Sequence, residues 1–318
     1  MKIPQYTLRK TRGYGTGVIH HPPNQQETMK KEYMQKSLIK IGSSETLRAV
    51  CSEKISNINT RARGKTLSTL QFSHWLGGLI DGDGTLLCSI KGYTSCEITV
   101  GEKQLNILQL VKSELGGSIK CRTGVKAYRW RLHNKPGMLQ LVQLINGKLH
   151  LAQRQCQLQR VCAALQCIYL PVKRISRYNG WLAGFYEAEG YFNVNSITLQ
   201  CSVTQSQKDR LLLEEISAAL PGPIYYDKSW DEWLYAASTL EDISRWVHYF
   251  SLFPLRSWKQ IQLQRFKRIL LYKSRGVHLR GPAGGRPWKR FQRLVEEFRK
   301  EYGSLKEEKR KRYLSKKI

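Results

Sequence analysis

A nine-residue motif occurs twice in this chain of 318 residues, and the repetition constrains the fold more than any other feature. Leu76-Gly-Gly-Leu-Ile-Asp-Gly-Asp-Gly84 recurs as Leu182-Ala-Gly-Phe-Tyr-Glu-Ala-Glu-Gly190, at a shift of 106 residues. Two shorter matches follow at a shift of 105, Cys96–Val100 with Cys201–Gln205 and Gln157–Arg160 with Gln262–Arg265. Three matches in nearly one register predict two copies of a unit of roughly a hundred residues.

Each unit has the same predicted order of elements, which is helix, two strands, helix, two strands and two helices. Cys96, Ile98 and Val100 alternate with polar residues, a pattern typical of a strand with one buried and one wet face. The predicted helices span about 73–83, 104–115, 137–147 and 151–168 in the first unit, and 179–189, 208–220, 240–250 and 257–272 in the second. This order predicts an α+β fold with antiparallel sheets.

The charge of the chain indicates a polyanionic partner. Lys and Arg number 53 against 24 Asp and Glu, for a formal net charge of +29. No apolar run approaches the roughly 18 residues that span a bilayer, so no membrane partner is expected. Eight cysteines occur without a Cys-x-x-Cys pair, which excludes a zinc ribbon and favours reduced thiols packed in the core.

Both ends of the chain are basic. Residues 1–70 hold 13 basic and 4 acidic residues, and residues 276–318 hold 14 and 5. We therefore divide the chain into a basic N-terminal extension (1–70), two repeats (71–172 and 173–275) and a basic C-terminal extension (276–318). In the last part, a loop over 281–287 precedes an amphipathic helix that is expected to dock through Trp288, Phe291, Leu294, Val295, Phe298 and Tyr302.

The two motif helices carry small residues four apart, Gly78 with Gly82 and Gly184 with Ala188. Glycine inside a helix costs about 1 kcal/mol relative to alanine, which indicates a backbone that must be approached closely. If the two helices pack through these residues, their C-terminal ends meet and bring Asp83 and Glu189 together. Two neighbouring carboxylates favour a hard divalent cation such as Mg²⁺ or Ca²⁺. The sequence thus predicts a metal site between the repeats.

The two copies of the motif resemble the signature of the single-chain, intron-encoded LAGLIDADG homing endonucleases, over about 200 of the 318 residues. The resemblance implies a monomer with two pseudosymmetric halves packed through the motif helices. In each half a four-stranded antiparallel sheet would lie in the major groove of a long, asymmetric site in double-stranded DNA. Both strands would be cut with Mg²⁺, and Mn²⁺ or Ca²⁺ could replace it for binding. Organellar origin, in a mitochondrion or a chloroplast, is implied in the same way.

The resemblance also assigns roles to single residues. Asp83 and Glu189 are the metal-binding catalytic acids, whereas Asp81 and Glu187 are structural. Gln205 or Gln207 would hold water in the second half, where the first half has Val100 and Glu102; this departure makes the halves unequal and puts equal cutting of the two strands in doubt. Lys259, with Arg154 as its repeat mate, would be the peripheral catalytic lysine.

Sequence recognition is expected on the wet faces of the strands. The DNA-contacting residues would be Glu97, Thr99, Arg129 and Arg131 in the first half and Thr198, Gln200, Ser202 and Thr204 in the second. Two alternatives remain open. Proteins similar to this family act as maturases that bind intron RNA, a role that basic ends also suit, because phosphate contacts do not distinguish DNA from RNA. The chain could also be a relic that binds DNA without cutting it.

Overall fold

The structure, a computed structural model, describes residues 69–194, 199–206, 210–228 and 232–315. The first repeat consists of α3 (Thr69–Asp83), β1 (Gly84–Cys88), β2 (Thr94–Gly101), η1 (Glu102–Gln104), α4 (Leu105–Leu115), β3 (Ser118–Cys121), β4 (Ala127–Leu132), α5 (Lys135–Ile145) and α6 (Ala152–Leu165). The second consists of α7 (Trp181–Glu189), β5 (Gly190–Val194), β6 (Leu199–Ser206), α8 (Arg210–Ala219), β7 (Ile224–Asp227), β8 (Glu232–Ala237), α9 (Leu240–Leu252) and α10 (Lys259–Ser274). The short helices η3 (Val277–Leu279) and η4 (Gly281–Gly284) lead to α11 (Gly285–Ser315).

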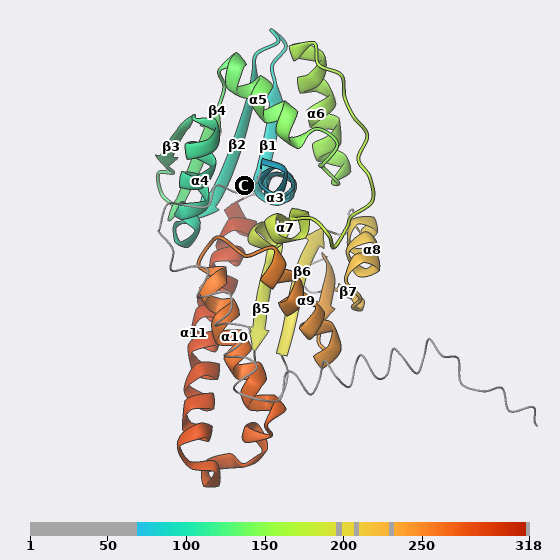
Figure 1. Cartoon of the computed structure of the whole chain (residues 1–318). Helices are drawn as coiled ribbons and strands as arrows, with labels where there is room; N and C mark the ends of the chain where they lie inside the picture. The colour runs from blue at the N-terminus through green and yellow to red at the C-terminus, as the bar shows by residue number, and fades with distance from the viewer. Residues whose placement is uncertain (1–68, 195–198, 207–209, 229–231, 316–318) are drawn as a thin grey trace, which may run out of the picture. The chain divides into compact units, whose positions relative to one another are not determined.

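The two repeats share one sheet topology. Each sheet is four-stranded and antiparallel, with the orders β1-β2-β4-β3 and β5-β6-β8-β7. The pairing register also agrees, since Val100 pairs with Tyr128 in one sheet and Gln205 pairs with Trp233 in the other. The predicted α+β fold of two pseudosymmetric repeats is confirmed, and Figure 1 shows α3 and α7 between the two halves.

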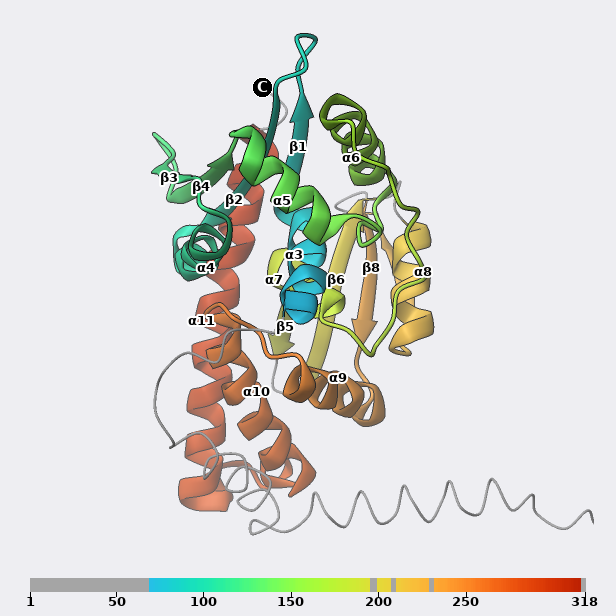
Figure 2. The same cartoon turned by 45° about the horizontal axis from the view of Figure 1, so that its top comes forward.

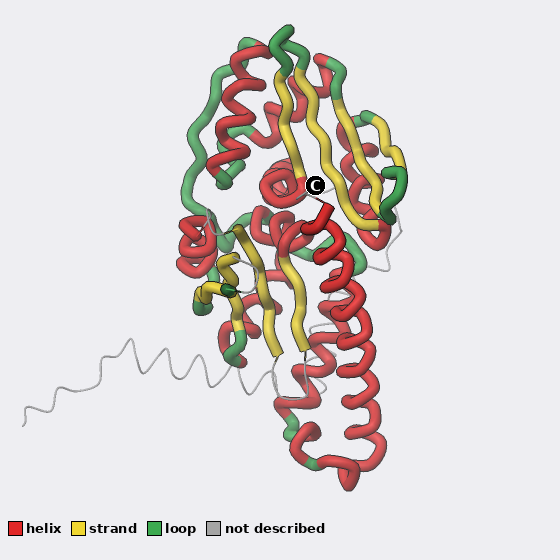
Figure 3. The backbone as a smooth tube through the Cα atoms, turned by 180° about the vertical axis from the view of Figure 1, so that it is seen from behind, coloured by secondary structure: helices red, strands yellow, loops and turns green. Residues whose placement is uncertain are grey.

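Among the described residues, the helices within each repeat cover one face of its sheet. In the first sheet Cys96, Ile98, Trp130 and Leu132 are fully buried, as the alternation predicted, and α4, α5 and α6 pack against the sheet. The other face carries the partly or fully exposed polar residues of the same strands. In Figure 1 the helices of the repeats lie in front of the strands, and in Figure 3, from behind, the strands lie in front of those helices. The strands therefore present an open face on the side away from these helices.

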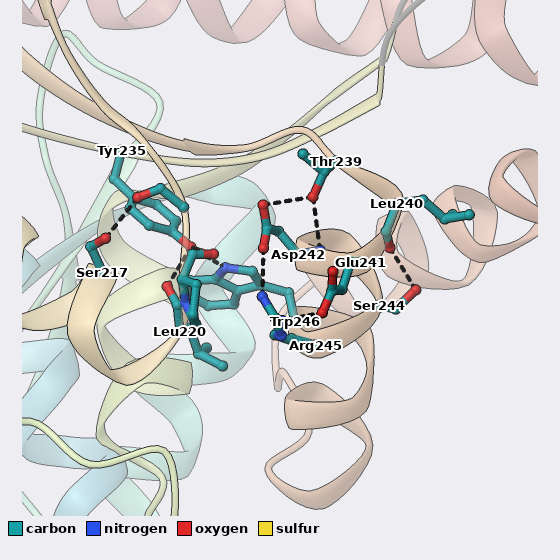
Figure 4. Close-up of polar contacts among 12 residues, drawn as sticks. Ser217, Leu220, Tyr235, Thr239, Leu240, Glu241, Asp242, Ser244, Arg245 and Trp246 are labelled. Atoms are coloured by element: carbon teal, nitrogen blue, oxygen red, sulfur yellow. Dashed lines mark hydrogen bonds and ion pairs between the residues drawn. The ribbon is translucent and has the colours of Figure 1, made fainter. Parts of the chain in front are cut away.

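The second sheet is tied to α9 by polar contacts that Figure 4 shows. The hydroxyl of Tyr235 donates to the carbonyl oxygen of Leu220 at 2.8 Å and accepts from the indole nitrogen of Trp246 at 2.8 Å. The α9 helix begins after Thr239, whose side chain accepts from the backbone N–H of Asp242 and satisfies a donor that the first turn leaves free. The contacts of Tyr235 join β8, an inner strand of the sheet, to α9 and to the residue that follows α8.

The C-terminal helix docks through the predicted positions that the structure describes, with Trp288 and Leu294 partly buried, whereas the side chain of Tyr302 lies outside the described residues. Phe291, Val295 and Phe298 of α11 are buried, and α11 packs against α10 and β5. The prediction of a loop over 281–287 was wrong, because η4 occupies part of this range and α11 begins at Gly285. Pro287 lies in the first turn of α11, where its missing N–H needs no partner.

Other boundaries differ by a few residues from the predicted ones. The helix expected over 151–168 ends at Leu165, because Gln166 adopts a left-handed conformation with φ of 58°. Cys121 and Cys156 are exposed, so the prediction of core thiols was wrong for these two, and Cys51 and the side chain of Cys201 lie outside the described residues. Within the described ranges, no helix combines the length and apolar composition needed to cross a bilayer. The division of the chain at residues 70, 172 and 275 stays a prediction.

Candidate active site at the paired helix ends

The site is built on the close packing of α3 against α7. An ideal Cβ added to Gly78 would lie 2.0 Å from the carbonyl oxygen of Trp181, and one added to Gly82 would lie 2.2 Å from Cβ of Ala188. Real atoms cannot approach so closely, so only glycine fits at these positions. The two backbones touch along the small residues, as the spacing in the sequence predicted. In Figures 1 and 2 these two helices lie between the halves.

The last residues of the two helices are the two predicted acids. Asp83 ends α3 and Glu189 ends α7, and both are partly exposed. The Cβ position of Gly82 lies 3.2 Å from Cγ of Glu189, so Glu189 packs against the residue that precedes Asp83. Each helix stops at a glycine, Gly84 or Gly190, whose missing Cβ leaves room for Ile80 or Tyr186 one turn earlier. The structure therefore presents both carboxylates at the junction of the two halves.

The sixth-position acids of the motif, Asp81 and Glu187, are fully buried. Asp81 accepts hydrogen bonds from the backbone N–H groups of His150 (2.7 Å) and Leu151 (3.2 Å), just before α6. It also accepts from the indole nitrogen of Trp181 at 3.0 Å, across the interface between the repeats. Burial raises the pKa of Asp81 to about 7, against the opposing effect of these hydrogen bonds.

Glu187 plays the same part in the second repeat. It accepts from the backbone N–H groups of Arg256 and Ser257 and from the hydroxyl of Ser257, just before α10. In both repeats a buried carboxylate thus fixes the segment that starts the last helix. These contacts fit the structural role that the motif resemblance implied for Asp81 and Glu187.

A basic residue lies beneath each motif helix. Lys259 is buried, and its Nζ donates to the carbonyl oxygens of Tyr186 (2.9 Å), Glu187 (2.6 Å) and Gly190 (2.7 Å). An ammonium group at these carbonyls is favourable, because a helix C-terminus carries partial negative charge. Lys259 therefore holds the end of the helix that carries Glu189.

Arg154 is the repeat mate of Lys259 in space as well as in sequence. Its Nε donates to the carbonyl oxygen of Ile80 at 3.3 Å, and Ile80 corresponds to Tyr186 at the shift of 106. Burial lowers the pKa of Arg154, while charge interactions with carboxylates, among them Glu189 and Asp83, act in the opposite direction. One guanidinium thus lies within electrostatic range of both acids. Sequence reasoning treated Arg154 only as the mate of Lys259 and gave it no role of its own, although that match was a usable signal.

The open face of the first sheet carries the predicted DNA-contacting residues of that half. Glu97 forms ion pairs with Arg129 at 3.2 Å and with Arg131 at 3.3 Å, and Thr99 is partly exposed beside them. In the second half, Gln200, Ser202, Thr204 and Gln205 lie in β6, where the backbone register pairs Ser202 with Ala236. Thr198 and Gln207 lie outside the described residues.

The carboxylate pair fits a hard divalent cation. Within the described part of the chain, no group of three or more His, Cys, Asp and Glu side chains gathers as a metal site. Mg²⁺ does not need such a group, since it commonly binds one or two carboxylates and takes its other ligands from water and substrate phosphates. Two partly exposed carboxylates at adjoining helix ends match that donor set.

The model of the LAGLIDADG endonuclease family matches residues 76–165 and 182–270, which hold both motifs and both sheets. The chain belongs to the LAGLIDADG endonuclease family. Among its relatives in this family, the intron-encoded RNA maturase bI4 of Saccharomyces cerevisiae is 36% identical over 51% of this chain and 26% of its own length. The probable intron-encoded endonuclease aI2 of Debaryomyces hansenii is 33% identical over 69% of this chain. The chain spans only 35% of the length of the Debaryomyces relative and 26% of the length of the Saccharomyces relative.

Solved LAGLIDADG structures share the fold. The I-LtrWI LAGLIDADG homing endonuclease bound to target DNA superposes with a TM-score of 0.57 at 17% identity, over 72% of this chain and 98% of that one. I-SmaMI bound to an uncleaved DNA target in the presence of calcium ions gives 0.52 at 21% identity, over 73% and 98%. More than a quarter of this chain therefore lies outside the superposed LAGLIDADG core.

Proposed function

We propose that this protein is a site-specific DNA endonuclease that acts as a monomer and hydrolyses both strands of a long, asymmetric duplex site with a divalent metal, Mg²⁺ in the first place. The observation that carries the proposal is the placement of Asp83 and Glu189 at the touching ends of α3 and α7. Relatives named as intron-encoded endonucleases and a neighbour bound to target DNA support it.

Asp83 and Glu189 would hold the metal, one carboxylate from each half, so that each half serves one strand. When bound there, the cation neutralises charge on the scissile phosphate and lowers the pKa of a bound water. Arg154 adds a fixed positive charge near both acids, which favours the negative charge that develops during hydrolysis. Asp81, Glu187 and Lys259 keep the helix ends in place.

Unequal halves remain part of the proposal. Gln205 or Gln207 of the second half is proposed to hold water, where the first half has Val100 and Glu102. Val100 is fully buried in the first sheet and cannot replace a polar side chain. We therefore expect one strand to be cut faster than the other.

The open faces of the two sheets are the proposed DNA surface. The contacts in the first half would come from Glu97, Thr99, Arg129 and Arg131, and arginine commonly reads guanine in the major groove. Those of the second half would come from Thr198, Gln200, Ser202 and Thr204. Together the two faces account for a long site without internal symmetry.

An intron-RNA-binding maturase is the second candidate, and the relative named RNA maturase bI4 favours it. Its test is splicing of the host intron in vitro, and an unchanged splicing rate with added protein would exclude it. A further relative is named as a cox1 intron-2 protein of Schizosaccharomyces pombe. We propose on this basis an organellar intron as the origin of the chain, in a mitochondrion rather than a chloroplast.

The endonuclease proposal is tested by cleavage of a defined target. The target is recovered by selection from a randomised DNA library, sequenced after binding and again after cutting. Asp83→Asn and Glu189→Gln should each lower the cleavage rate at least about 100-fold in Mg²⁺, while binding in Ca²⁺ stays within a few-fold of the unmodified protein. Glu114→Gln, which removes an exposed carboxylate from α4, is the control and should cut normally.

Two results would contradict the proposal. If the unmodified protein binds the selected site tightly but cuts it in neither Mg²⁺ nor Mn²⁺, the chain is a DNA-binding relic. If Asp83→Asn and Glu189→Gln cut as fast as Glu114→Gln, the paired helix ends are not the active site.

A further inference from the structure

We propose that the outer face of α11 is a second DNA-binding surface, which contacts phosphates of the duplex beyond the part that lies on the sheets. The inference rests on the proposed function, because it assumes that duplex DNA occupies the open faces of the sheets. It adds a contact that is separate from both repeats, since the second family match ends at residue 270 and α11 begins at Gly285.

The first half of α11 has two chemically opposite sides. Phe291, Val295 and Phe298 are buried against α10 and β5. At 100° per residue the opposite side of the helix carries a row of exposed basic residues. This basic row consists of Arg286, Lys289, Arg290, Arg293 and Lys300.

The basic row is largely free of acidic partners. Of the described residues, none forms an ion pair with Arg286, Lys289 or Arg290. Arg293 lies 3.8 Å from Glu297, but its side chain is 75% exposed, so that pair contributes little. In contrast, Arg129 and Arg131 share Glu97, and Arg245 is paired with Asp242 at 2.7 Å. Glu297 is the acidic residue on the same side, so within the described ranges the row keeps at least three charges without an ion pair, those of Arg286, Lys289 and Arg290.

The position of α11 points to DNA rather than to another polyanion. The helix packs beside β5, an edge strand of the second sheet. In Figure 1 α10 lies in front of α11, and in Figure 3 α11 lies in front, on the same side as the open faces of the strands. A duplex on the second sheet would therefore pass this helix, and its nearest phosphates would be within reach of the basic row.

The size of the row suits a phosphate backbone. From Arg286 to Lys300 the helix rises roughly 21 Å at 1.5 Å per residue. Duplex DNA carries about one charge per 1.7 Å of its axis, so several phosphates lie along that length. Contacts of this kind do not read sequence. They would instead raise affinity and its dependence on salt.

The test compares two triple variants that each remove three exposed positive charges. Arg286→Gln, Arg290→Gln and Arg293→Gln alter the basic row, and Lys173→Gln, Arg174→Gln and Arg177→Gln alter the segment between the repeats. Both are titrated in Ca²⁺ at several salt concentrations with two duplexes, the selected site alone and the same site with about 20 added base pairs on each side. With three lost phosphate contacts, the α11 variant should lose roughly 2 to 3 units of the log–log salt slope on the extended duplex. The matched variant should lose none, and the two should agree on the short duplex.

Three outcomes would overturn the inference. The first is an unchanged salt slope for the α11 variant on the extended duplex. The second is an equal loss of slope in both variants, which would reflect net charge alone. The third is weaker binding of the α11 variant to the host intron RNA without a change in its binding to DNA. Circular dichroism checks that α11 is still folded. The proposed endonuclease is judged separately, by cleavage of the short duplex, which the α11 variant should retain. If the unmodified protein does not cut that duplex, the endonuclease proposal fails, but the salt slopes of the two variants can still be compared.

Discussion

An ideal Cβ on Gly184 would lie 1.8 Å from the carbonyl oxygen of Trp75, which is less than the length of any non-bonded contact between heavy atoms. Gly184 belongs to α7 and Trp75 to α3, so one missing methyl group sets the distance between the two repeats. The same close approach of the two backbones sets the distance between Asp83 and Glu189, because each of these residues ends one of the two helices.

Gly184→Ala should therefore push the motif helices apart. We expect a loss of about 3 kcal/mol in the free energy of unfolding, only partly offset by the higher helix propensity of alanine. That corresponds to a fall of roughly 10 °C in Tm, measured by calorimetry. Gly180→Ala is the control, since its Cβ would meet Gln71 at 3.3 Å and needs only a small adjustment. Equal Tm values for the two variants would show that the interface does not depend on the glycine.

The fold could be predicted because the repeat and the strand alternation are local patterns. Ile98 and Trp130 are buried where the alternation placed them, and each motif helix ends at its glycine. The helix end at Gln166 could not be predicted, because a left-handed residue other than glycine leaves no clear signal. The loop expected around Pro287 failed because proline is compatible with a first helical turn as well as with a loop.

The positions of Asp83 and Glu189 at adjoining helix ends were predictable from the repeat, but their surroundings were not. The contact from Trp181 to Asp81 joins residues 100 positions apart and follows from packing alone. For the same reason the sequence did not distinguish Lys259, buried beneath one helix end, from Arg154, which lies near both acids. The burial of a residue depends on which distant parts of the chain pack over it, and a local sequence pattern does not contain that information.

Substitution of Arg154 should mainly affect the cleavage rate, whereas substitution of Lys259 should mainly affect stability. Arg154→Gln should lower the cleavage rate about 10-fold to 100-fold, because a charge near the reacting phosphate is lost. It should also lower the Mg²⁺ concentration for half-maximal rate, since the guanidinium no longer repels the cation. Lys259→Met should instead cost about 3 kcal/mol of stability, because three carbonyl oxygens lose a buried charged donor. Rates measured against Mg²⁺ and urea denaturation distinguish the two, and the reverse pattern would contradict this assignment.

Asp81 and His150 should give opposite dependences of stability on pH. The pKa of Asp81 is raised to about 7 by burial, so between pH 4 and 7 the folded state retains a proton that the unfolded state has lost, and stability falls as pH rises. The pKa of His150 is lowered to about 4, by burial and by His74, so between pH 4 and 6.5 stability rises with pH.

The two variants Asp81→Asn and His150→Gln isolate these effects. Asp81→Asn leaves the His150 contribution, and its stability should rise more steeply with pH than that of the unmodified protein, by up to about 1.4 kcal/mol per pH unit. His150→Gln leaves the Asp81 contribution and should lose stability as pH rises. Urea denaturation at pH 4.5, 5.5 and 6.5 gives the slopes, which are read apart from any change in absolute stability. Parallel slopes for all three proteins would show that these groups do not titrate in that range.

Glu97 should limit the DNA affinity of the first sheet, because it holds Arg129 and Arg131 in ion pairs at 3.2 and 3.3 Å. Glu97→Gln frees both guanidinium groups for phosphates or bases and removes a negative charge from the proposed DNA surface. Affinity for random-sequence duplex should rise several-fold, and the log–log salt slope should steepen by about 1 to 2 units. Preference for the selected site over random DNA should fall, because unpaired arginines bind any phosphate.

Glu114→Gln removes the same charge from an exposed position on α4 without releasing an arginine, so it controls for net charge. If both variants show the same slope and the same preference as the unmodified protein, Glu97 does not restrain these arginines, and the first sheet recognises its half of the site through other residues.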